Sequence, residues 1–98
     1  MSIIIHVSVG AEKRTEFFSE NRIKIGVDET CDLQIHSAQT DIEGTWLEFE
    51  LAGNDYQVIK IKPNLSFLIN RKPLQLNDII SDGDSISLQG TSISFSFF

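Results

Sequence analysis

Residues 85–97 read Ser-Ile-Ser-Leu-Gln-Gly-Thr-Ser-Ile-Ser-Phe-Ser-Phe, an almost strict alternation of polar and large apolar side chains around one glycine. A period of two is typical of a β-strand with one face against a core and the other in water. The break at Gln89-Gly90-Thr91 is typical of a turn. This segment therefore predicts a hairpin of two antiparallel strands.

The same alternation recurs earlier in the chain. In residues 3–9, every second side chain is isoleucine or valine, which predicts another strand. Residues 46–51, Trp-Leu-Glu-Phe-Glu-Leu, bury both leucines and the phenylalanine only if the tryptophan and the glutamates face outward. This register predicts that the side chain of Trp46 is exposed to water.

Turn-forming residues separate further short strands. Gly53-Asn54-Asp55 predicts a hairpin with residues 56–62, and Asp82-Gly83-Asp84 predicts another turn. Pro63 and Pro73 flank a short strand over 66–69, and residues 11–20 read as a loop followed by a strand. With 14 Ile and 7 Phe against 3 Ala, the composition favours strands over helices. About ten short, mostly antiparallel strands predict an all-β sandwich.

Length and charge narrow the class of protein. The 98 residues, 41% of them hydrophobic and 22% charged, predict a single domain over 1–98 with an ordinary core. No apolar run is long enough to insert into a membrane. A net charge of −6 argues against nucleic acid as a partner, because phosphate contacts need Lys and Arg. The lone Cys31 forms no intrachain disulfide, which favours a cytoplasmic location.

No group of residues predicts catalysis, a metal or a cofactor. Cys31 and His36 lack a third residue that would orient the imidazole. Asp78, Asp82 and Asp84 lack the spacing of a calcium loop and are explained by turn formation. We therefore expect this domain not to be an enzyme.

Three blocks, in this order, resemble the forkhead-associated (FHA) family. They are Arg-Ile-Lys-Ile-Gly at 22–26 with Cys-Asp-Leu-Gln-Ile at 31–35, Phe-Leu-Ile-Asn-Arg at 67–71, and Ile-Ser-Asp-Gly-Asp-Ser-Ile-Ser-Leu at 80–88. The resemblance implies an eleven-stranded β-sandwich. It also implies that loops at one end of the sandwich read phosphothreonine.

The family's phosphate-binding residues are largely replaced. Val27 stands where phosphothreonine-binding members have an arginine, and Thr40 and Asp41 stand in the loop that carries Ser-x-x-His in the family. The resemblance implies that the remaining peptide-binding candidates are Asn64, Ser66, Asn70 and Arg71. We therefore expect a degenerate member that binds a protein partner with little dependence on phosphorylation.

Three alternatives remain open. The first is a functional phosphothreonine-binding domain. Its anion site would then consist of a basic side chain, from Arg71 or Lys72, together with Asn64, Ser66 and Asn70. The second concerns four basic residues, which either protect strand edges or attract an acidic partner: Lys60, Lys62, Arg71 and Lys72. The third concerns Trp46, which is either an interface residue or a structural one.

The final strand continues to Phe98 without a polar tail, which predicts that residues 1–98 are the N-terminal domain of a longer protein. FHA-like relatives with eroded phosphate sites lie in bacterial secretion machines, in a membrane-anchored type VII ATPase and in a type III ring protein. Gly44-Thr45-Trp46 favours the first. The resemblance then implies a cytoplasmic, non-catalytic interaction domain whose parent is an ATPase with a transmembrane segment after residue 98.

Overall fold

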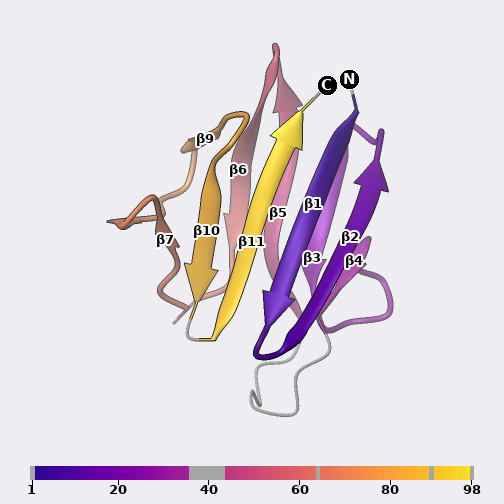
Figure 1. Cartoon of the computed structure of the whole chain (residues 1–98). Coiled ribbons are helices and arrows are strands. Elements are labelled where there is room, and N and C mark those ends of the chain that lie inside the picture. The colour runs from indigo at the N-terminus through magenta and orange to yellow at the C-terminus, as the bar shows by residue number, and fades with distance from the viewer. Residues whose placement is uncertain (1, 36–43, 64, 89, 98) are drawn as a thin grey trace.

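The computed structural model describes residues 2–35, 44–63, 65–88 and 90–97, and these residues form a sandwich of two β-sheets (Figure 1). Sheet A has six strands, in the order β2 (Glu12–Phe18), β1 (Ile3–Val9), β11 (Thr91–Phe97), β10 (Ser85–Leu88), β7 (Leu68–Ile69) and β8 (Lys72–Pro73). Sheet B has five, in the order β4 (Leu33–Gln34), β3 (Arg22–Gly26), β5 (Thr45–Ala52), β6 (Asp55–Ile61) and β9 (Ile79–Ile80).

The predicted all-β sandwich is confirmed. All strand pairs of the described residues are antiparallel except β3 with β4. The hairpin predicted over residues 85–97 is β10–β11, with Ile86 opposite Ile93. The hairpin predicted around residue 54 is β5–β6. The described residues contain no helix that is long and apolar enough to cross a bilayer.

The core lies between the sheets and follows the alternation of the sequence. Ile3, Ile5 and Val7 are buried on the inner face of β1, while His6 on the opposite face is exposed. The two sheets meet through aromatic rings, with Phe49 of β5 and Phe95 of β11 edge to face at a centroid distance of 5.5 Å. This geometry adds a specific contact to the burial of apolar surface.

The last strand completes the centre of sheet A. β11 pairs with β1 over seven residue pairs, from Ile3 opposite Phe97 to Val9 opposite Thr91, and with β10 on its other side. Both ends of the described chain therefore lie at the same end of the sandwich (Figure 1). The most distant parts of the sequence therefore form neighbouring strands inside sheet A.

The outer face of sheet B carries a ladder of alternating charge. The guanidinium of Arg22 on β3 lies 3.5 Å from Oε2 of Glu50 and 4.0 Å from Oε1 of Glu48. Glu48 also stands between Lys24 and Lys60 in the strand register. Cross-strand pairs of opposite charge contribute roughly 0.2 to 1 kcal/mol each. The arrangement explains how Glu48 tolerates an exposed fraction of only 8%.

Trp46 is buried, which corrects the prediction that it faces water. Its exposed fraction is 0%, and its ring lies 6.4 Å from that of Phe67 between centroids. The cause is a β-bulge: Ile25 pairs with Leu47 but Gly26 pairs with Thr45, so Trp46 is the extra residue of β5. A bulge breaks the period of two and re-aims side chains. Trp46 and Leu47 are consequently both buried, and Trp46 is structural.

Candidate functional site

The described parts of three connections lie at one end of the sandwich, which we call the loop end. They are residues 27–32 between β3 and β4, residues 35 and 44 at the two ends of the β4–β5 connection, and residues 62, 63 and 65–67 between β6 and β7. They converge because β3 ends where β5 begins, and β5 begins beside the end of β6. Figure 1 places this end opposite the chain termini.

At Gly26 the backbone of β3 passes very close to the backbone of Gly44 and Thr45, at the start of β5. A Cβ on Gly26 would lie 2.3 Å from the carbonyl oxygen of Gly44 and 2.8 Å from Cα of Thr45. The same position would be 3.0 Å from Sγ of Cys31, which itself lies 3.7 Å from Oγ1 of Thr45. Cys31 is buried here as a small packing residue. Only glycine fits between these backbones.

Val27 offers neither charge nor a hydrogen-bond donor to a ligand. Its side chain is half-buried and packs against the core, and its N–H donates to the carbonyl oxygen of Gly44 at 3.0 Å. The carbonyl of the preceding glycine accepts from the N–H of Ile35 at 2.7 Å. The N–H of Val27 and the carbonyl of Gly26 thus both hold neighbouring connections together.

Lys62, which the sequence analysis considered only as part of a basic patch, places a positive charge at the loop end. Its N–H donates to the carbonyl oxygen of Trp46 at 2.9 Å, which fixes the residue beside the start of β5. Its Nζ lies 3.4 Å from the position of a Cβ on Gly44. Among the described residues, no carboxylate lies within ion-pair distance of this ammonium. The residue type was visible in the sequence, but its place beside Gly44 depends on the pairing of β5 with β6.

Of the other predicted site residues, Ser66 lies exposed in the β6–β7 connection. Thr40, Asp41 and Asn64 lie outside the described residues. Val27 and Ser66 therefore belong to connections of the loop end, and Trp46 lies in the core beneath it.

Asn70 and Arg71 form the two-residue turn between β7 and β8, away from the loop end. The φ angles are 48° for Asn70 and 72° for Arg71, so the tight turn forms without the glycine that such turns favour. The Asn70 side chain donates from Nδ2 to Oδ1 of Asp84 at 3.0 Å, and its Oδ1 accepts from the N–H of Ser85 at 3.4 Å. These bonds tie the turn to the start of β10.

Replacing Arg71 with glycine is expected to stabilise the domain. A left-handed conformation costs a non-glycine residue roughly 1 to 2 kcal/mol, part of which is offset by the greater freedom of glycine in the unfolded chain. We expect a net gain of about 0.5 to 1 kcal/mol in the free energy of unfolding, measured by urea titration. Asn70→Gly is the matched control at the adjacent position and should destabilise, because it removes the bonds to Asp84 and Ser85. A loss of stability in Arg71→Gly would contradict this account.

The basic residues considered as a patch lie on different sheets. Lys60 is on β6 of sheet B, opposite Glu48, whereas Lys72 is on β8 at the edge of sheet A and Arg71 is in the turn before it. Lys60 takes part in the charge ladder, which explains its position without a ligand.

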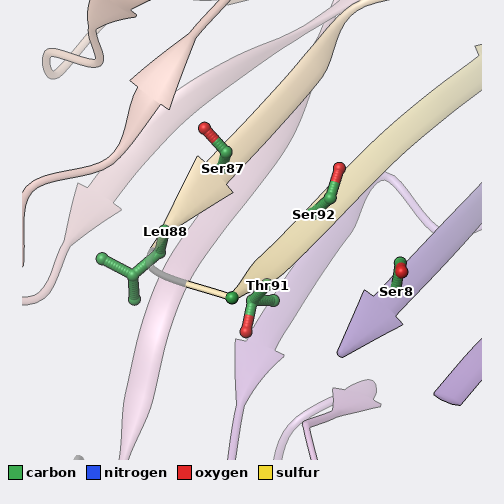
Figure 2. A pocket seen from close by; sticks show the side chains of 6 residues that line it. Ser8, Ser87, Leu88, Thr91 and Ser92 are labelled. Carbon is green, nitrogen blue, oxygen red and sulfur yellow. The ribbon is translucent and has the colours of Figure 1, made fainter. Parts of the chain in front are cut away.

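A shallow hollow of about 350 Å³ lies near the β10–β11 turn (Figure 2). Its lining consists of hydroxyl groups, one leucine and backbone: Ser8, Ser87, Leu88, Gly90, Thr91 and Ser92. This lining contains no charged or titratable side chain, so the hollow has no group for acid–base chemistry. Among the described residues, no group of three His, Cys, Asp or Glu is placed to hold a metal ion.

No family model matches the sequence, and no curated protein matches it. Solved structures do match. The cytoplasmic domain of PscD, a sorting-platform protein of the type III secretion system of P. aeruginosa, has a TM-score of 0.83 and 14% identity, over 99% of this chain and 81% of that one.

Two further matches are FHA domains. The yeast Dun1 FHA domain, in complex with a doubly phosphorylated peptide from Rad53, has a TM-score of 0.82 and 21% identity, over 98% of this chain and 74% of that one. The FHA domain of CT664 from Chlamydia trachomatis has a TM-score of 0.81 and 11% identity, over 100% and 99%. The chain therefore has the FHA fold, as its three sequence blocks predicted.

Proposed function

We propose that this domain is a non-catalytic protein-interaction module that binds its partner without requiring phosphothreonine. The observation that carries the proposal is the state of Val27: an aliphatic side chain against the core, with its N–H already bonded to Gly44. A phosphate with about two negative charges is bound by charge-assisted donors, each contributing roughly 1.5 to 3 kcal/mol. Losing two such donors weakens binding by about two to four powers of ten.

The likeness to PscD supports the finer proposal that the module is a cytoplasmic scaffold domain of a bacterial secretion machine. PscD belongs to a type III system, so the comparison favours that class over the type VII ATPase suggested by the sequence. Membrane anchoring of the parent protein and a transmembrane segment after residue 98 remain predictions.

A phosphothreonine peptide library tests the proposal directly. We expect no peptide to bind more tightly than about 1 mM, and no weak binding to depend on the phosphate. The Dun1 FHA domain with its phosphorylated Rad53 peptide is the positive control. Binding tighter than millimolar that disappears on dephosphorylation would refute the proposal.

Such binding would support the second candidate, a phosphothreonine reader. The observation in its favour is Lys62, whose ammonium lies beside Gly44 with no ion pair in the described part of the chain. In that case Lys62→Ala would abolish phosphopeptide binding. Lys60→Ala, which removes the same charge from the outer face of sheet B, would leave it intact.

A further inference from the structure

β2 is the one long edge strand in the part of the chain that the structure describes. It has seven residues, whereas the other three edges, β4, β8 and β9, have two each. Figure 1 shows β2 at the side of sheet A with β1 as its neighbour. A long edge presents a row of backbone N–H and C=O groups that can pair with another strand.

The hydrogen-bond pattern shows which residues of β2 present these groups. The N–H of Gly10 donates to the carbonyl of Gly90, so even-numbered residues of β1 bond toward β11 and odd-numbered ones toward β2. Val9 and Val7 therefore bond to Glu12 and Arg14, their partners in the register. Lys13 and Thr15 alternate with these residues and direct their backbone groups toward the open edge.

Arg14 and Glu16 lie on the inner side of this edge. They are opposite Val7 and Ile5, which are buried. The guanidinium of Arg14 donates to the carbonyl oxygen of Gln34 on β4, and lies 3.8 Å from Oε2 of Glu16, beyond hydrogen-bond distance. That oxygen is buried and accepts no hydrogen bond from the described residues. The Glu16 side chain as a whole remains 39% exposed, so its carboxylate is open to an added donor from outside the chain.

The charges of β2 favour one register with a second copy of itself. Two copies of β2 can pair only through the residues whose backbone groups point to the open edge, such as Lys13 and Thr15. In an antiparallel pair, the two-fold axis between the copies must then pass through one of a few residues of β2. An axis at Arg14 places this arginine opposite Arg14 of the other copy. An axis at Glu16 likewise places two Glu16 carboxylates opposite each other. Centring on Lys13 opposes two lysines and shortens the ladder. Only centring on Thr15 places Arg14 opposite Glu16 twice.

We propose that this chain self-associates through β2, antiparallel, with the two-fold axis at Thr15. The two copies then form one continuous sheet of twelve strands. Arg14 of each copy supplies a donor to the carboxylate of Glu16 in the other. The segment Glu12–Glu16 carries two positive and two negative charges, so the net charge of −6 on each copy is not concentrated at this edge. This self-association is independent of the partner site at the loop end.

Charge-swap variants test the proposal by sedimentation equilibrium between about 10 µM and 1 mM, where a small interface associates. Unmodified protein should form dimers in this range. Arg14→Glu and Glu16→Arg should each weaken association by about tenfold or more, because each creates two like-charge pairs. The double variant and a mixture of the two single variants restore opposite pairs and should associate as the unmodified protein does.

Two controls separate the strand contact from general effects. Lys72→Glu makes the same change in net charge as Arg14→Glu, but on β8 rather than β2. It should therefore leave association unchanged. Thr15→Pro removes an N–H that faces outward, so it should abolish association while the circular dichroism spectrum is preserved. Monomer at every concentration, or failure of both the mixture and the double variant to recover dimers, would overturn the proposal. An equal loss in Lys72→Glu would overturn it as well.

Discussion

Gly26→Ala is expected to remove a large part of the stability of the protein. The added Cβ would lie 2.3 Å from a backbone oxygen and 2.8 Å from a backbone carbon, and neither atom can move without shifting β5. Overlap with backbone belongs to the mechanisms that cost about 4 kcal/mol or more. A domain of this size has a total stability of roughly 5 to 15 kcal/mol. Urea titration should therefore show a large drop in the midpoint.

Gly53→Ala is the matched control for this prediction. Gly53 lies in the β5–β6 turn with a φ of 67°, and no atom lies within 4 Å of the position of its Cβ. The substitution introduces only the left-handed strain, about 1 to 2 kcal/mol. Equal losses in the two variants would show that crowding at Gly26 is not the cause.

Trp46→Ala should cost about 3 to 5 kcal/mol in the free energy of unfolding. The side chain has an exposed fraction of 0% and lies beside Phe67, so its removal leaves a cavity in a close-packed core. Thermal or urea unfolding measures the loss. Leu76→Ala is the control, since Leu76 is 56% exposed and its truncation should change stability by less than about 0.5 kcal/mol.

The fluorescence of Trp46 provides an independent check on the unmodified protein. Iodide should not quench it in the native state and should quench it after unfolding, because the ring is buried. Strong quenching in the native state would contradict the burial and return Trp46 to the interface candidates.

Alternation predicted β1, β5 and the β10–β11 hairpin, and with them much of the core. The serines of residues 85–97 do face away from the buried Ile86, Ile93 and Phe95. Alternation failed at Trp46 because it assumes an unbroken period of two. The bulge depends on how β5 meets Gly26 of a different strand, and the local sequence of β5 does not contain that information.

The candidate site was predicted in part. The resemblance to the FHA family singled out Val27, but the bond from its N–H to Gly44 joins residues 17 positions apart. The turn at Asn70 and Arg71 lacks the glycine that such turns favour. It forms because Asp84 and Ser85, which are distant in sequence, hold Asn70 in place. Contacts of this kind follow from topology rather than from any local pattern.

The insertion of β11 between β1 and β10 has a consequence for how the protein folds. Until residue 97 has emerged from the ribosome, sheet A consists of two separate pieces, β2–β1 and β10–β7–β8, each with an apolar face lacking its neighbour. The central contacts also join the two ends of the sequence, which raises contact order and slows folding. The nascent chain therefore exposes aggregation-prone strand edges until β11 has been synthesised.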